Sequence, residues 1–187
     1  AGREMELNIL DWFQTLHTPI LDKIMTSITK LGDAGIFWII LTLLFLIIPK
    51  MRKTGIIMAS ALIMDLLICN VAVKNLVART RPYDVNTSVQ LLVAKLHDYS
   101  FPSGHTAASF ASVTALYLAG EKKLWKSALV LACLIAASRL YLYVHYPTDV
   151  LGGMFFGILA GFAGYWIVKF LEAKLSGRKN AGKQVRR

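Results

Sequence analysis

Long apolar blocks separated by short polar stretches occupy most of the chain from residue 34 onward. A helix that crosses about 30 Å of hydrocarbon needs about 20 mostly apolar residues. Five blocks reach or approach that length, and each contains at most two Asp, Glu, Lys, Arg or His side chains. They are residues 34–49, 54–73, 99–120, 127–146 and 150–168. The pattern predicts an all-α fold, a polytopic membrane helical bundle with five transmembrane helices.

The first 33 residues have a different pattern, with apolar side chains at three- and four-residue steps on both sides of Pro19. The apolar residues in this pattern are Leu7, Leu10 and Phe13 before Pro19, and Leu21, Ile24, Ile28 and Leu31 after it. This spacing predicts two short interfacial helices in residues 1–33, lying on the membrane surface. The alternative is a sixth transmembrane helix from the same region.

Composition narrows the class of protein, because 56% of the residues are hydrophobic and only 17% are charged. Such a chain is too apolar for an ordinary water-soluble enzyme. The net charge of +10 does not indicate a nucleic-acid partner, because the cations interrupt apolar runs instead of lining a polar face. Cys69 and Cys133 lie inside apolar runs without metal-like or redox-like spacing, so both are expected to be small core residues.

The distribution of Lys and Arg predicts the orientation in the membrane, because cytoplasmic loops carry the excess of these residues. Residues 50–53, 122–126 and 169–187 hold 13 of the 21 cations and share one side if five helices span. Residues 172–187 are then a basic cytoplasmic tail of a single domain that covers residues 1–187. The polar stretch 79–98, long enough for a lid, is then an extracytoplasmic loop.

Three cations lie at the extracytoplasmic face, although that face should be poor in them: Lys74, Arg81 and Arg139. A lone Lys or Arg at a helix end is often an anchor that reaches the membrane surface. Three at one level favour a tetrahedral phosphate as the ligand, because guanidinium groups pair bidentately with its oxygens.

A second signal for an anion is the sequence Pro102-Ser103-Gly104-His105, directly before an apolar helix. Ser103 is a plausible cap, and the unpaired amides that follow it attract an anion at the helix N-terminus. Gly104 allows the backbone to approach a bound oxygen closely. A plain helix cap is the alternative, but it does not account for His105 at the water boundary of a span.

His145 and Asp149 are four residues apart, a spacing that places both on one face of a helix. A carboxylate bonded to one ring nitrogen fixes the tautomer and leaves the other nitrogen as a nucleophile or base. A structural pairing is the alternative for these two residues alone. Beside a phosphate site, a nucleophilic histidine is the better interpretation.

Asp65 interrupts the second apolar block nine residues before Lys74, half a turn out of phase with it on an α-helix. We therefore expect Asp65 to face away from the phosphate site in a structural role, with a proton or substrate role as the alternative. Asn70, four residues before Lys74, is expected on the same face and in position to orient the ammonium group.

For three further groups of residues, the sequence supports only less specific expectations. Loop residues considered for contact with a substrate head group are Arg79, His97 and His17. Aromatic residues expected in a belt at the membrane surface are Tyr141, Tyr143 and Tyr146. Glycines expected to pack a helix inside the bundle are Gly153, Gly157 and Gly161.

Taken together, these positions resemble the complete three-part signature of the type 2 phosphatidic acid phosphatase superfamily. The signature comprises Lys74 with Arg81-Pro82, then Pro102-Ser103-Gly104-His105, then Ser138-Arg139 with His145 and Asp149. In size and layout the chain is most similar to the short bacterial undecaprenyl-diphosphate phosphatases associated with bacitracin resistance. The signature is also similar to that of vanadium haloperoxidases, but those are soluble, so the apolar blocks count against that activity.

The resemblance implies an integral membrane lipid phosphatase of a bacterial plasma membrane, with its active site on the extracytoplasmic side and its C-terminus in the cytoplasm. The implied reaction is metal-independent hydrolysis of a lipid phosphate or diphosphate. Undecaprenyl diphosphate, converted to undecaprenyl phosphate, is the first substrate, and phosphatidylglycerol phosphate and phosphatidic acid are alternatives. A non-catalytic lipid-phosphate binder or transporter is the alternative of another class. The oligomeric state is left open.

The resemblance also implies a role for each matching residue. His145 would attack phosphorus and form a phosphohistidine, oriented by Asp149, and His105 would protonate the leaving oxygen and then activate water. The residues implied to hold the phosphate oxygens are Lys74, Arg81, Ser103, Gly104 and Arg139. The residues expected to support them are Pro82, Ser138 and Asn70. No metal or other cofactor is expected, because the cations neutralise the phosphate and no cluster of carboxylates is available for Mg²⁺.

Overall fold

The computed structural model describes residues 1–184, with side-chain surroundings up to residue 178, and all regular structure in that range is helical. The N-terminal part contains α1 (Gly2–Gln14), α2 (Pro19–Leu31), the short 3-10 helix η1 (Asp33–Gly35) and α3 (Ile36–Ile47). The next part contains η2 (Pro49–Met51), α4 (Arg52–Asp65), the π-helix η3 (Leu66–Val73) and α5 (Lys74–Val77). The remaining helices are α6 (Pro82–Val85), α7 (Gly104–Leu118), α8 (Leu124–Tyr141) and α9 (Pro147–Gln184). The all-α prediction is confirmed.

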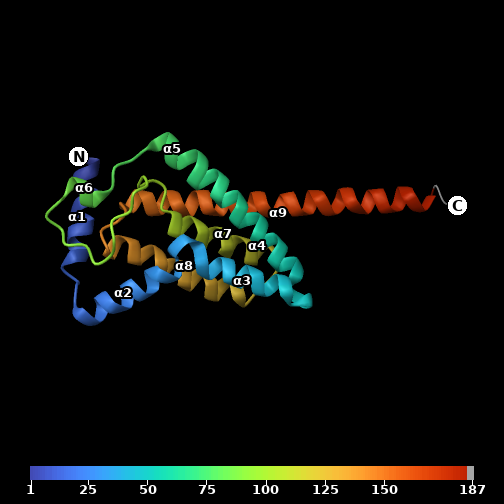
Figure 1. Cartoon of the computed structure of the whole chain (residues 1–187), viewed down its shortest axis with the longest axis horizontal. Helices are drawn as coiled ribbons and strands as arrows, with labels where there is room; N and C mark the ends of the chain where they lie inside the picture. Colours follow the sequence, from blue (N-terminus) through green and yellow to red (C-terminus); the bar gives the residue numbers. More distant parts are fainter. Residues whose placement is uncertain (185–187) are drawn as a thin grey trace.

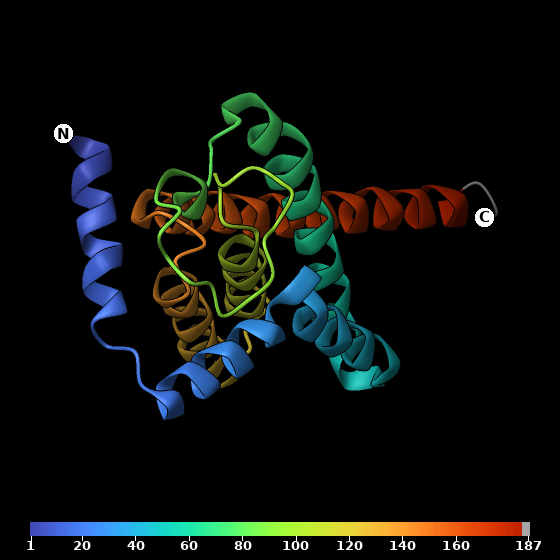
Figure 2. The same ribbon diagram turned by 60° about the vertical axis from the view of Figure 1, so that its left-hand side comes forward.

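Figure 1 shows a bundle in which α9 is the longest helix, with its C-terminal part extending past the other helices. α1 and α6 lie at the opposite end of the bundle from the C-terminus, and Figure 2 shows the loop before α7 at that same end. Most of the tail predicted at residues 172–187 belongs to α9, and its last three residues lie outside the described range.

Within the described residues, three stretches are long and apolar enough to cross a membrane: Pro49–Val85, Leu124–Tyr141 and Pro147–Arg178. α2 and α3 together would make a fourth span, bent by 43°. The block 99–120 becomes a helix only from Gly104, because Ser103 caps α7. α7 has 15 residues and lies inside the bundle, with 11 of them buried. The number of five spans therefore stays a prediction.

α7 and α9 pack closely because small residues face each other. A Cβ atom on Gly157 would lie 2.4 Å from the carbonyl oxygen of Ala107, and one on Gly153 would lie 2.7 Å from that of Ser103. The prediction that these glycines pack a helix inside the bundle is confirmed. The close approach also joins the N-terminal ends of both helices, since the Ser103 amide donates a hydrogen bond to the Asp149 carbonyl oxygen over 3.0 Å.

The π-helix η3 changes which residues of its helix share a face. Nine residues make two and a half turns of α-helix but about two turns of π-helix, in which hydrogen bonds run from i to i+5. Asp65 and Lys74 therefore line the same cavity, together with Asn70. The prediction that Asp65 faces away from the phosphate site is wrong, because it assumed a regular α-helix.

The N-terminal helices cover the turn that joins α8 to α9. Tyr141, Tyr143 and Tyr146 lie beneath them and are fully buried, so the prediction of an aromatic belt at the membrane surface is wrong. The Tyr143 hydroxyl donates to Asp11 of α1 over 2.7 Å, and the Tyr141 hydroxyl donates to Asp22 of α2 over 2.5 Å. These bonds fix α1 and α2 to the end of the bundle that carries the candidate site.

Candidate active site

The ends of several helices converge on one cavity of about 980 Å³. Lys74 begins α5, Arg81 precedes α6, His105 lies in the first turn of α7, Arg139 lies in the last turn of α8, and His145 lies between α8 and α9. All five side chains line the cavity. The structure thus brings together the cations and the two imidazoles that the sequence predicts to lie at one site.

His145 is 1% exposed and lies between a guanidinium group and a carboxylate. Its Nε2 is 3.2 Å from Arg81, and its Nδ1 is 3.5 Å from Asp149 Oδ2, slightly longer than an ordinary hydrogen bond. Burial, together with the charges of Arg139 and Arg81, lowers the pKa of His145 well below its usual range. The imidazole is therefore neutral at pH 7, and with a proton on Nδ1 the lone pair of Nε2 accepts a hydrogen bond from Arg81.

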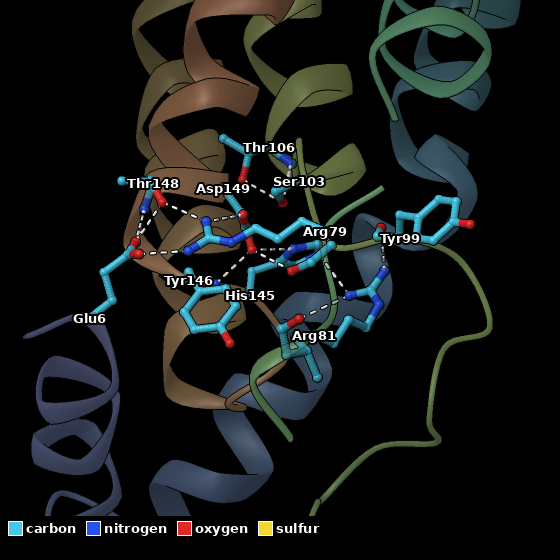
Figure 3. Close-up of polar contacts among 12 residues, drawn as sticks. Glu6, Arg79, Arg81, Tyr99, Ser103, Thr106, His145, Tyr146, Thr148 and Asp149 are labelled. Atoms are coloured by element: carbon cyan, nitrogen blue, oxygen red, sulfur yellow. Dashed lines mark hydrogen bonds and ion pairs between the residues drawn. The ribbon is translucent and has the colours of Figure 1, made fainter. Parts of the chain in front are cut away.

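Asp149 is fully buried, and its two carboxylate oxygens are held from different sides (Figure 3). Oδ2 accepts hydrogen bonds from the Tyr146 amide over 2.8 Å and from the Ser100 hydroxyl. Oδ1 accepts from Arg79 over 2.7 Å. The carboxylate beside His145 is thus fixed by groups from three separate parts of the chain.

Arg79 points inward to this carboxylate and is absent from the residues that line the cavity, so its predicted contact with a head group is not seen. Its guanidinium group also donates to Thr148 Oγ1 and to Glu6 Oε2, each over 2.6 Å, and lies 3.9 Å from the Tyr146 ring centroid. Glu6, on α1, completes the cluster by accepting from the Thr148 amide over 2.9 Å (Figure 3). Sequence reasoning missed Glu6, because its partners lie more than 70 residues away.

Asp98 joins two of the cavity-lining cations, and no sequence motif indicated it. Its carboxylate accepts from Lys74 Nζ over 2.5 Å and from Arg81 over 2.6 Å. Burial alone would raise the pKa of Asp98, but Lys74 and Arg81 lower it to about 2. The loop predicted at residues 79–98 therefore places an ionised carboxylate on the two cations that the sequence assigned to phosphate.

The N-terminus of α7 opens onto the same cavity through Gly104 and His105. Ser103 caps the helix, since its hydroxyl accepts from the Thr106 amide over 3.4 Å, as the sequence predicts. A Cβ atom on Gly104 would lie 3.6 Å from Asn70 Oδ1 and 3.9 Å from Lys74 Nζ. The glycine thus leaves space beside the ammonium group.

A further part of the cavity wall is formed by His105 and Arg139. Nε2 of His105 lies 2.8 Å from the carboxylate of Asp33 and 3.4 Å from Arg139. Arg139 is 2% exposed and donates to Thr29 Oγ1 over 2.8 Å. In the part of the chain that the structure describes, its Nε and NH2 atoms have no hydrogen-bond partner. Asp33 was missed because it stands at the start of an apolar block without a motif around it.

The three residues expected to support the site have different positions. Asn70 lines the cavity as predicted. Pro82 is buried at the start of α6, directly after Arg81. Ser138 is buried but does not line the cavity, because its hydroxyl donates to the backbone oxygen of Ile135 over 2.6 Å.

Residues 54–172, which include all the cavity-lining cations, match the PAP2 superfamily. The chain belongs to this family. It is 33% identical over 137 residues to an undecaprenyl-diphosphatase of Sulfolobus acidocaldarius, covering 73% of this chain and 66% of that one. It is 31% identical over 174 residues to phosphatidylglycerophosphatase B of Bacillus subtilis, covering 86% and 79% of the two chains.

The fold of this PAP2 protein is also similar to a solved structure. A transmembrane PAP2 type phosphatidylglycerolphosphate phosphatase from Bacillus subtilis matches it with a TM-score of 0.69 and 28% identity. The match covers 92% of this chain and 87% of that one. The chain is a membrane-bound lipid phosphatase of the PAP2 superfamily, as the signature in its sequence implied.

We expect Asp98→Asn to strengthen anion binding in the cavity, because it frees Lys74 and Arg81 from an ionised partner. A partly exposed ion pair is worth about 1 kcal/mol, so inhibition by inorganic phosphate should strengthen about fivefold. With a pKa of about 2, Asp98 is ionised throughout the range from pH 5 to pH 8, so the effect should not depend on pH there.

Competition of inorganic phosphate with a lipid substrate measures this change. Asp84→Asn is the matched control, because Asp84 is similarly exposed but pairs with Lys95 over 4.0 Å instead. Unchanged or weaker inhibition in Asp98→Asn would show that Asp98 does not occupy the anion position.

Proposed function

We propose that this lipid phosphatase hydrolyses the terminal phosphate of a lipid phosphate or diphosphate through a phosphohistidine at His145. The observation that carries the proposal is that His145 and His105 line one cavity with Lys74, Arg81 and Arg139. A protein that only binds or transports an anion needs the cations but has no need for two imidazoles beside the phosphate.

In the first half of the proposed reaction, the lone pair of His145 Nε2 forms a bond to phosphorus. The bond between the terminal phosphorus and the leaving oxygen breaks, and His105 supplies the proton to that oxygen. The leaving oxygen is the bridging oxygen of a diphosphate or the ester oxygen of a monophosphate. Asp149, which lies 3.5 Å from His145 Nδ1, compensates the positive charge that develops on the imidazole. In the second half, His105 takes a proton from water, the water oxygen bonds to phosphorus, the phosphorus–nitrogen bond breaks, and inorganic phosphate leaves.

Phosphoryl transfer depends mainly on positioning and on stabilisation of charge. Lys74, Arg81 and Arg139 supply three positive charges. The Nε and NH2 of Arg139, which have no partner among the described residues, are donors that we assign to phosphate oxygens. The backbone at Gly104 adds the N-terminal end of α7. These groups take the place that a metal ion holds in many phosphatases, so we propose a metal-independent reaction.

We propose that the cavity faces the extracytoplasmic side of a bacterial plasma membrane. The concentration of Lys and Arg in residues 50–53, 122–126 and 169–187 supports this orientation. The C-terminal part of α9, which carries much of the basic tail, lies at the far end of the bundle from α1 (Figure 1). The tail would then lie in the cytoplasm.

Undecaprenyl diphosphate is the first substrate proposed, and the similarity to the undecaprenyl-diphosphatase of Sulfolobus acidocaldarius supports it. Phosphatidylglycerol phosphate is the second candidate. It is supported by the similarity to the Bacillus subtilis phosphatidylglycerophosphatase. Phosphatidic acid is a third lipid of the same class.

We expect His145→Ala to lower phosphate release from undecaprenyl diphosphate at least about 10³-fold, because no other nucleophile replaces the imidazole. Excess EDTA should leave the wild-type rate unchanged. Phosphate release from the purified protein in detergent measures both effects, and phosphatidylglycerol phosphate and phosphatidic acid are tested in parallel.

His97→Ala is the control for this experiment, because His97 also lines the cavity but lies exposed in the loop. It should keep most of the activity. Wild-type protein that binds lipid phosphates without releasing phosphate would favour a binder or transporter, and an active His145→Ala variant would exclude the phosphohistidine.

We expect Arg79→Ala to lower kcat roughly tenfold to a hundredfold with little change in KM. Arg79 holds the buried carboxylate of Asp149 but does not line the cavity. A hydrogen bond to a charged group contributes about 1.5–3 kcal/mol, and each 1.36 kcal/mol is about tenfold in rate. Arg81→Ala is the comparison, because Arg81 lines the cavity and its loss should raise KM as well. Equal effects of both variants on KM would contradict a positioning role for Arg79.

A further inference from the structure

The cavity extends beyond the phosphate end as an apolar groove between α3 and α4. Side chains that line this part are Ile39, Leu43, Leu46, Leu62, Ile63 and Leu66. Four of them, Ile39, Leu43, Ile63 and Leu66, are between 45% and 58% exposed. A groove with such walls faces the hydrocarbon of the membrane, so the body of a lipid would enter the site along it.

Asp65 is an exception among these apolar walls. Its side chain lines the cavity, yet the residue is only 6% exposed, and within residues 1–178 its Oδ1 has no hydrogen-bond partner. The Cys69 thiol, one turn along the helix, is a weak donor. A carboxyl oxygen at membrane depth without a partner costs free energy, and ionisable residues at that depth usually have a functional role.

The π-helix η3 sets the distance of Asp65 from the phosphate position. The Lys74 ammonium group lies at the level of Asn70, because both would contact a Cβ atom on Gly104, at 3.9 Å and 3.6 Å. Asp65 is five residues before Asn70, which is one turn of π-helix. Its carboxyl group therefore lies about one helical turn further along the groove than the Lys74 ammonium group, and one helical turn rises about 5 Å.

We infer that Asp65 forms a subsite that accepts a hydrogen bond from a hydroxyl group located between the terminal phosphate of the substrate and its tails. A glycerol hydroxyl next to the phosphate, as in phosphatidylglycerol phosphate, lies at about this distance. A polyprenyl diphosphate and phosphatidic acid have no donor there. The inference rests on the proposed function, and it favours phosphatidylglycerol phosphate, the second candidate there, over undecaprenyl diphosphate.

The test compares phosphatidylglycerol phosphate with a synthetic analogue in which the head-group hydroxyl is replaced by hydrogen. For the wild-type protein we expect kcat/KM to be at least about tenfold higher for the hydroxyl-bearing lipid, because a buried acceptor loses a charge-assisted hydrogen bond with the analogue. Asp65→Leu should hydrolyse both lipids equally well. Asp65→Asn, which keeps an acceptor oxygen, should retain part of the preference.

Each ratio compares two lipids on one protein sample, so partial misfolding of a variant does not change it. Thr42→Val is the matched control, because Thr42 lines the same cavity but its hydroxyl already donates to the Trp38 carbonyl oxygen over 2.7 Å. It should keep the wild-type ratio. A wild-type ratio near one, or an Asp65→Leu variant with the wild-type ratio, would overturn the inference.

A second measurement separates this inference from the proposed reaction. The Kd values of the same two lipids are compared on His145→Ala protein, where turnover is not needed. A hydroxyl preference in binding without hydrolysis by the wild-type protein would support the subsite and overturn the proposed function. Equal Kd values together with equal turnover would overturn the subsite alone.

Discussion

Three buried cations around one cavity are the constraint on which the rest of the site depends. Lys74, Arg81 and Arg139 are 8%, 3% and 2% exposed, and like charges that lose their hydration raise the free energy of the folded protein. Asp98 offsets the charges of Lys74 and Arg81, while Arg139 keeps donors without a partner in the described residues. We propose that a phosphate satisfies all three cations better than one carboxylate does, because it brings more charge and more oxygens. The free energy of this arrangement thus favours phosphate binding.

The helix packing converts this electrostatic arrangement into a geometry. Gly153 and Gly157 let α9 approach α7 closely, and this contact places Asp149 next to the capped end of α7. α1 adds a further layer, since Glu6 holds Arg79, and Arg79 holds Asp149. The imidazole of His145 is therefore oriented through a chain of contacts that reaches the N-terminal helix. Such preorganisation of charged groups is the main contribution that a protein makes to phosphoryl transfer.

Much of the fold and site could be predicted from the sequence, because apolar blocks and motif spacings are local. The helical membrane bundle and the cavity residues Lys74, Arg81, His105, Arg139 and His145 followed from such patterns. Contacts between distant segments could not be predicted in this way. Asp98 and Asp33 reach the site through the geometry of a loop and a turn. Glu6 contacts Thr148, which lies 142 residues further along the chain. Asp65 was misplaced because the position of a π-helix depends on packing that the spacing does not encode.

Transfer of the phosphoryl group to His145 is the central step of the proposed reaction, and trapping of the phosphoenzyme tests it most directly. The wild-type protein is mixed with a lipid substrate that is radiolabelled in its terminal phosphate, the reaction is stopped in alkali, and the labelled peptide is identified. We predict label on the peptide that contains His145, with no label in the His145→Ala variant. Rapid turnover without any labelled peptide, or label on His105 instead, would contradict the account.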